Sequence, residues 1–321
     1  MLFSLSKPAS LLLGGFFITL IQGCSSISLQ SDNLLATKPA EFIQAKELAE
    51  VNFNPQLAYE CGPAALATIL QWQGVEVSDQ DLVPQIYLPE KKGSLQVELL
   101  AATRRYEKIP YVIEKDMRAL LSEVKAGNPV LVLQNLGLDW YPKWHYAVVI
   151  GYDINKDEII LRSGENKRHI NSFSLFEQTW RRAKYWGFIA LSKGKLPATG
   201  NAFSYLKTVA AFEELKKPKF AFDAYQAGLQ RWPEDKNLLM AIGNASYSRG
   251  NVDTAAYYYR KVSVRWPKYT PALNNLAQVL FEKKELDEAE NLILLAIKQD
   301  DKNKKKYKAL LNEIRVARKA R

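Results

Sequence analysis

A short pattern recurs at a fixed interval in the last third of the sequence, and no other feature restricts the fold as strongly. Its members form three series with a spacing of 34 residues: Ala221, Ala255 and Ala289; Tyr225, Tyr259 and Ile293; Pro233, Pro267 and Asp301. A small residue lets two helices approach closely, and a proline ends a helix because it lacks an N–H group. The period therefore predicts a solenoid of antiparallel helix pairs, in which each pair buries its apolar face against the next.

The order of small residue, aromatic residue and proline resembles the tetratricopeptide repeat. The second repeat is the clearest, because Gly243, Tyr247 and Gly250 also match, and the repeats at 202–236 and 270–303 are degenerate but in phase. Solenoids present concave surfaces, so we expect the repeats to bind a peptide or protein partner. The alternative is that they only lengthen and stabilise the chain.

The positive charge is concentrated at the carboxyl end. The chain has a net charge of +10, and residues 302–321 hold nine Lys or Arg side chains against one Glu. The remainder is close to neutral, so we expect no nucleic-acid partner. Residues 307–320 predict a basic amphipathic helix that caps the repeats. We expect its charges to form a solvated face; contact with anionic lipid or an acidic partner is the alternative.

The amino-terminal residues predict a targeting segment. Residues 11–21 form an apolar run of the length of a signal-peptide core, shorter than the ~20 residues that cross a bilayer. The run leads to Gly23 and Cys24, which resembles a bacterial lipoprotein signal; an ordinary signal peptide is the alternative. The resemblance implies that 1–23 is removed, that Cys24 is lipidated, and that the protein is anchored to the outer membrane facing the periplasm. The polar residues 24–50 are expected to be a tether.

Cysteine and histidine are scarce, with two of each. No disulfide framework or zinc site is expected from so few, and we expect no metal and no cofactor. If Cys24 carries the lipid, Cys61 is the remaining thiol. Pro63 suits the first turn of a helix and 64–72 is rich in helix formers, so a helix is predicted to begin at Cys61. The helix dipole stabilises a thiolate there, which predicts an activated nucleophile and argues against a small buried apolar residue.

The residues after this helix predict a sheet that carries a histidine. Residues 129–133 have the pattern of a buried strand, His145 opens a second strand, and 158–162 form a third. A helix bearing Cys followed by a sheet bearing His is the layout of papain-like cysteine peptidases, in which His takes the thiol proton and later protonates the leaving amine. The other histidine, His169, is expected to be an exposed strand or loop residue.

Aromatic residues surround His145 in the sequence: Trp140, Tyr141, Trp144 and Tyr146. Packing in the core or in the wall of a cleft is the default expectation for such side chains. Some of them are candidates to line a groove for a peptide.

Four stretches resemble the bacteriocin-processing double-glycine peptidase superfamily and, within it, stand-alone lipoproteins that carry tetratricopeptide repeats. They are C-G-P-A-A-L-A from Cys61, G-S-L from Gly93 with the helix predicted at 96–106, G-N-P-V-L-V from Gly127 and H-Y-A-V-V-I-G-Y-D from His145. The resemblance implies an α+β papain-like cysteine peptidase domain at 51–193. A linker at 194–201 and an all-α tetratricopeptide-repeat solenoid at 202–321 would follow.

The resemblance also implies roles for single residues. Cys61 matches the nucleophile and His145 the general base. Gln56 matches a glutamine whose amide forms the oxyanion hole with the Cys61 N–H group; a surface loop residue is the alternative. The family places an Asp against the histidine, whereas here Ser163 lies closest to that position, with Asn166 as a substitute. A neutral partner holds the tautomer but stabilises an imidazolium less than a carboxylate does, so reduced or specialised activity is expected.

Two functions remain open. The first is a membrane-anchored cysteine peptidase that cleaves a peptide bond in an exported or periplasmic peptide or protein, with the repeats recruiting the substrate or a partner. The second is a catalytically weak or inactive peptide-binding lipoprotein scaffold. The Cys61 and His145 pair favours the first, and the missing Asp favours the second. Transfer or amidase chemistry on cell-wall peptides is a weaker third hypothesis.

Overall fold

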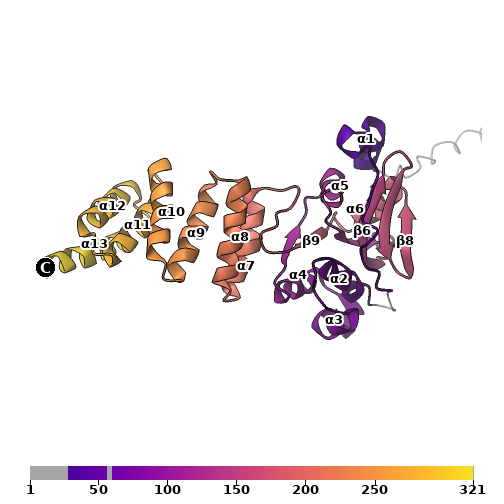
Figure 1. Cartoon of the computed structure of the whole chain (residues 1–321), viewed down its shortest axis with the longest axis horizontal. Helices are drawn as coiled ribbons and strands as arrows, with labels where there is room; N and C mark the ends of the chain where they lie inside the picture. Colours follow the sequence, from indigo (N-terminus) through magenta and orange to yellow (C-terminus); the bar gives the residue numbers. More distant parts are fainter. Residues whose placement is uncertain (1–27, 56–59, 321) are drawn as a thin grey trace, which may run out of the picture.

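The computed structural model describes residues 28–55 and 60–320. A sheet-containing domain comes first and a row of helices extends from it along the long axis of the molecule (Figure 1). The predicted signal peptide, Cys24 and Gln56 lie outside the described residues. In the ranges that are described, no helix has the length and apolar character needed to cross a membrane.

Within these ranges the first domain is built on a seven-stranded sheet with the order β4-β9-β5-β6-β7-β8, and β1 also pairs with β6. The strands are β1 (Lys46–Glu47), β4 (Ile109–Val112), β5 (Val130–Asn135), β6 (Trp144–Asp153), β7 (Glu158–Ser163), β8 (Asn166–Asn171) and β9 (Gly187–Leu191). Neighbouring strands run antiparallel. The three predicted strands are confirmed as β5, β6 and β7, because each is a run of β-branched and apolar residues that the sheet buries.

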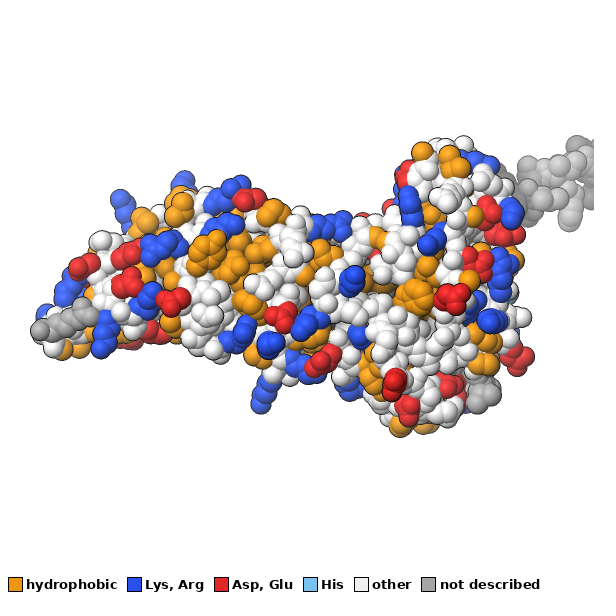
Figure 2. Space-filling view, in the orientation of Figure 1, with side chains coloured by type: hydrophobic (Ala, Val, Ile, Leu, Met, Phe, Trp, Pro, Cys, Tyr) orange, Lys and Arg blue, Asp and Glu red, His pale blue; other side chains and the backbone are white. Residues whose placement is uncertain are grey.

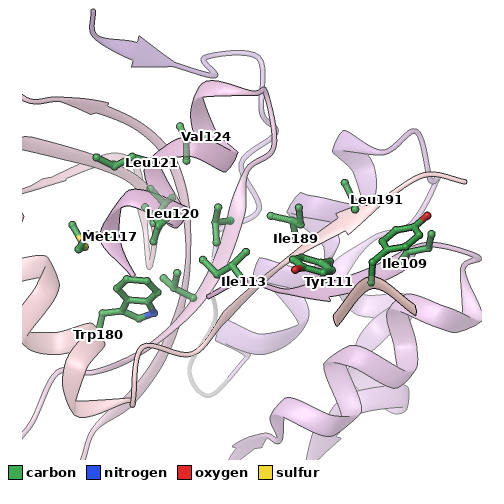
Figure 3. Packing of buried hydrophobic residues seen from close by; sticks show 14 of the residues in the cluster. Ile109, Tyr111, Ile113, Met117, Leu120, Leu121, Val124, Trp180, Ile189 and Leu191 are labelled. Atoms are coloured by element: carbon green, nitrogen blue, oxygen red, sulfur yellow. The ribbon is translucent and has the colours of Figure 1, made fainter. Parts of the chain in front are cut away.

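Helices cover both faces of the sheet. On one face lie α2 (Cys61–Trp72), α3 (Asp79–Ile86) and α4 (Gln96–Arg105), beside a short hairpin of β2 (Tyr87–Leu88), η2 (Pro89–Lys91) and β3 (Gly93–Ser94). On the other lie α5 (Met117–Lys125) and α6 (Phe173–Arg182), whose Leu120 and Trp180 are fully buried (Figure 3). Strand β6 serves both cores, because side chains alternate along a strand: Val148 faces α2 and Val149 faces α5.

The segment predicted to be a tether, 24–50, is folded from Leu29 onward, as α1 (Leu29–Thr37), η1 (Ala40–Phe42) and β1. Leu34 and Phe42 are buried in the core of the sheet domain. The Ser31 N–H group donates to Glu177 Oε2 over 2.7 Å. The polar composition concealed this packing, because two apolar anchors and one buried acceptor are enough to fix a short segment. The described part of the segment is therefore no free spacer.

From residue 202 to 320, the described chain forms the predicted helix pairs and a final capping helix. The elements are α7 (Ala202–Glu214), α8 (Pro218–Arg231), α9 (Lys236–Ser248), α10 (Val252–Arg265), α11 (Thr270–Glu282), α12 (Leu286–Gln299) and α13 (Lys304–Lys319). Ala221, Ala255 and Ala289 are fully buried, as their role in close helix packing requires. A Cβ atom on Gly243 would lie 2.5 Å from Tyr259 Cε1, so this crossing also requires a residue without a side chain.

The two domains share one apolar core. Tyr111 of β4 and Tyr205 of α7 belong to the same buried cluster. The predicted linker is also fixed: the carboxylate of Glu123, which is fully buried, accepts hydrogen bonds from the N–H groups of Ala198 and Thr199, both over 3.0 Å. The repeats are therefore docked on the sheet domain.

The basic carboxyl end is partly neutralised within the array. Arg315 and Arg318 of α13 both form ion pairs with Glu290 of α12. On the face shown in Figure 2, Lys and Arg side chains are interspersed with Asp and Glu along the array.

Candidate active site

Cys61 is the first residue of α2, as predicted. Its neighbour Gly62 allows β3 to approach the start of the helix, because a Cβ atom there would lie 2.5 Å from Ser94 Oγ. The buried Tyr146 side chain supports the same contact, since its hydroxyl donates to the Ser94 carbonyl oxygen over 3.1 Å. The helix start is therefore held between β3 and β6, and the Cys61 side chain remains partly exposed.

His145 lies near the start of β6, and Ser163 is the last residue of β7. His145 Nε2 and Ser163 Oγ are 2.8 Å apart. Asn166 is exposed and pairs with Ser163 across the β7–β8 hairpin. Of the two residues considered as partners of the histidine, the structure thus places Ser163 on the ring. When Nε2 donates to Ser163, Nδ1 is the basic nitrogen.

A cavity of about 960 Å³ contains both Cys61 and His145 in its lining. Its other lining residues are Lys91, Lys92, Gly93, Ser94, Leu95, Gln96, Leu133, Lys143, Trp144, Tyr146, Gly164 and Glu165. They come from α2, β5, β6, the β2–β3 hairpin, the start of α4 and the turn after β7. The volume is within the range typical of ligand sites.

Burial decides the protonation states of the pair. It raises the pKa of the Cys61 thiol above its ordinary value, although the N–H groups of Tyr146, Gly62 and Cys61 itself act in the opposite direction. Burial also lowers the pKa of His145 from its ordinary value near 6.5 to about 4, and the charge of His169 adds to this effect. At neutral pH the resting pair is a thiol and a neutral imidazole.

This result differs from the predicted thiolate. A helix start favours a thiolate, but removing the charged sulfur from water costs more here than the N–H groups return. A neutral imidazole and a neutral thiol that line one cavity are still suited to covalent catalysis, because an imidazole can accept the proton as the sulfur attacks.

His169 is the residue that sequence reasoning undervalued. It is partly buried on β8, opposite Leu161 of β7, and it influences His145 electrostatically. A single histidine in a polar stretch gives no signal of this, because the influence depends on how the strands are arranged in the folded sheet.

The predicted aromatic cluster divides into two groups. Tyr146 is buried in the core, whereas Trp140, Tyr141 and Trp144 are 80%, 64% and 55% exposed. Trp144 lines the cavity. Among the described residues, no group of three or more His, Cys, Asp or Glu side chains is arranged to hold a metal ion.

A second, smaller cavity of about 340 Å³ lies in the repeat array. It is lined by Asn244, Tyr247, Tyr259, Asn274, Asn275, Gln278 and Lys306, from helices α9, α10, α11 and α13. Asn244 Oδ1 accepts from Tyr259 Oη over 2.8 Å and from Asn275 Nδ2 over 3.2 Å. Carboxamide groups therefore dominate this surface.

Comparisons with known proteins agree with this division of the chain. Residues 48–187 match the Peptidase_C39 like family, and residues 246–314 match the tetratricopeptide repeat. No curated protein matches the chain. The chain thus combines a Peptidase_C39-like domain with tetratricopeptide repeats, as its sequence predicted.

Several solved structures are similar to one part of the chain. A protein from Bacillus anthracis described as a C39-like peptidase is 19% identical and aligns with 46% of this chain and 98% of its own, with a TM-score of 0.41. The Yersinia enterocolitica type III secretion chaperone SycD, in complex with a peptide of the translocator YopD, is 20% identical. It aligns with 36% of this chain and 92% of its own, with a TM-score of 0.34. The Sgt2 TPR domain from Aspergillus fumigatus is 20% identical and aligns with 38% of this chain and 81% of its own, with a TM-score of 0.36.

Proposed function

Starting from a Peptidase_C39-like domain joined to tetratricopeptide repeats, we propose that this protein is a membrane-anchored cysteine peptidase. It hydrolyses a peptide bond in an exported or periplasmic peptide or protein. One observation carries the proposal: Cys61 and His145 line the same cavity of about 960 Å³, and Ser163 Oγ lies 2.8 Å from His145 Nε2. These residues supply the three kinds of group that covalent catalysis needs: a nucleophile, a base and an orienting group.

In the proposed reaction, His145 Nδ1 takes the proton of Cys61 as Sγ attacks the scissile carbonyl carbon. The Cys61 N–H group and the Gln56 amide stabilise the oxyanion that forms. The imidazolium then protonates the leaving amine, which leaves a thioester on Cys61. His145 next deprotonates a water molecule, whose attack releases the acid and restores the thiol.

Ser163 acts through His145 in this scheme. Its hydroxyl oxygen accepts a hydrogen bond from the Nε2–H group, which leaves Nδ1 unprotonated and able to act as the base. Because a hydroxyl carries no charge, it stabilises the imidazolium less than a carboxylate would. The same feature, with the raised pKa of Cys61, favours the second candidate function, a catalytically weak peptide-binding scaffold.

The repeats supply the second half of the proposal, which is recruitment of a substrate or partner protein. Asn and Gln side chains both donate and accept hydrogen bonds, so the carboxamides around the cavity of about 340 Å³ suit the backbone of an extended polypeptide. Since the array is docked on the sheet domain through Glu123, a polypeptide bound there is tethered to the domain that carries Cys61.

Membrane attachment completes the proposal, with Cys24 as the lipidated residue of an outer-membrane lipoprotein facing the periplasm. It is supported by the apolar run that leads to Gly23 and Cys24. Metabolic labelling with a fatty-acid probe tests it: the label should be present in the wild-type protein and absent from Cys24→Ala.

The pH dependence of Cys61 alkylation tests the proposed chemistry. A chain beginning at residue 25 has Cys61 as its single thiol. Its reaction with iodoacetamide should be level from about pH 5 to about pH 8, because His145 is a neutral base throughout that interval. In His145→Ala the rate should instead rise with pH toward the raised pKa of the thiol. His169→Ala is the control and should keep the level profile; identical profiles for wild type and His145→Ala would refute the assisted thiol.

A further inference from the structure

The connection between β5 and β6 is an ordered hairpin, residues 136–143, named here the β5–β6 hairpin. Leu136 N donates to Lys143 O over 2.9 Å, and Leu138 and Tyr141 exchange backbone hydrogen bonds of 3.1 and 3.2 Å. The Asn135 side chain fixes its base, because Oδ1 accepts from the N–H groups of Gly137 and Lys143, both over 2.9 Å. The backbone is therefore held in place before anything binds.

This ordered backbone displays large apolar side chains to solvent. Trp140 is 80% exposed and Tyr141 64%, with their ring centroids 6.0 Å apart. Leu136 and Leu138 are about half exposed. Exposed apolar side chains that lie together mark binding surfaces, and a rigid support lowers the entropy lost on binding.

The hairpin is continuous with the candidate active site. Lys143 and Trp144, at its end, line the cavity that contains Cys61 and His145. Three lysines, Lys91, Lys92 and Lys143, also line the cavity, against one acidic residue, Glu165. The lining therefore carries an excess of positive charge at neutral pH.

We propose that the site takes a polypeptide segment that is both acidic and apolar. A carboxylate of the segment faces Lys91 and Lys143 in the cavity, and a large apolar side chain packs on Trp140 of the β5–β6 hairpin. Charge complementarity and the continuity of the hairpin with the cavity select a polypeptide over a lipid surface, because a bilayer can contact the hairpin but cannot enter the cavity beside Cys61. This inference rests on the proposed function and specifies its substrate class.

Affinity selection from a random peptide library tests the inference. The protein used begins at residue 25 and carries Cys61→Ala. Because this variant lacks the proposed nucleophile, bound peptides are retained rather than cleaved. Peptides that combine Asp or Glu with Trp, Phe, Tyr or Leu should be enriched. Trp140→Ser should weaken binding of the enriched peptides about tenfold, the loss expected for a central aromatic contact. Lys91→Gln combined with Lys143→Gln should remove the preference for acidic residues.

Matched controls lie on other parts of the surface. Phe203→Ser removes an aromatic side chain that is 67% exposed on α7, and Lys125→Gln removes an exposed lysine on α5. Both should leave the selection unchanged.

Three outcomes would overturn the inference. The first is enrichment without acidic or large apolar residues, and the second is enrichment that Trp140→Ser and the lysine variant leave unchanged. The third is that Trp140→Ser reduces cosedimentation with phosphatidylglycerol vesicles and leaves peptide selection intact, which would make the hairpin a membrane contact. The proposed peptidase function is tested independently of this inference, by the pH dependence of Cys61 alkylation.

Discussion

The depressed pKa of His145 predicts a specific dependence of stability on pH. The folded protein keeps this imidazole neutral down to a pH of about 4, whereas the unfolded chain protonates it near 6.5. Between these values the unfolded state binds a proton that the folded state does not. Stability conferred by the neutral ring is therefore fully present above pH ~6.5 and is lost as the pH falls toward 4.

The size of the effect follows from the shift. A depression from near 6.5 to about 4 corresponds to about 3 kcal/mol of unfolding free energy once the pH lies below both values. At pH 4.5 about 2.5 kcal/mol of this should already be lost. His145→Gln removes the titrating group, so its stability should fall by about 2.5 kcal/mol less than that of the wild type between pH 7 and pH 4.5.

Urea unfolding followed by tryptophan fluorescence at the two pH values measures this difference. Carboxylates elsewhere titrate equally in both proteins and cancel in the comparison. His169→Gln serves as the control for loss of a histidine in the same region and should retain most of the wild-type pH dependence. Equal losses for wild type and His145→Gln, within about 0.5 kcal/mol, would show that the ring is solvated in the folded protein and refute the reasoning.

Three further predictions concern single contacts. Gly62→Ala should destabilise the sheet domain by about 1–3 kcal/mol, because its Cβ would overlap Ser94 Oγ; thermal unfolding at neutral pH measures the loss, and an unchanged midpoint would show that β3 yields freely. Ser163→Ala should slow Cys61 alkylation at pH 6 about tenfold and Ser163→Asp should restore it, since a carboxylate orients the imidazole and stabilises its cation; equal rates in all three proteins would remove Ser163 from the site. Glu123→Gln should expose the linker at 194–201 to limited proteolysis, because an amide cannot accept every bond that the carboxylate accepts; wild-type resistance would contradict its role.

Local patterns explain what the sequence predicted well. Pro63 and the alanines after it determine a helix start within a few residues, so the position of Cys61 at the start of α2 could be predicted from the sequence. The apolar run at β5 is long enough to identify a buried strand. The 34-residue spacing is set by helix packing, which is why Ala221, Ala255 and Ala289 are all buried as expected.

Long-range effects explain the rest. The raised pKa of Cys61 depends on how deeply β6 and β3 bury the thiol, and the residues next to Cys61 in the sequence do not indicate the depth of that burial. The packing of α1 depends on Glu177, which is 146 residues away from Ser31 in the sequence. The exposure of Trp140 on an ordered hairpin also had no local signal, because packing in the core or in the wall of a cleft is the default expectation for aromatic side chains.

Cleavage of natural peptides tests the central claim most directly. The chain from residue 25 is incubated with a peptide mixture prepared from a bacterial periplasm, and new peptide termini are identified by mass spectrometry. A Cys61–His145 peptidase should generate termini that are absent with Cys61→Ala and strongly reduced with His145→Gln. The same termini with Cys61→Ala, or none with the wild type, would contradict the peptidase and leave the peptide-binding scaffold as the function of this fold.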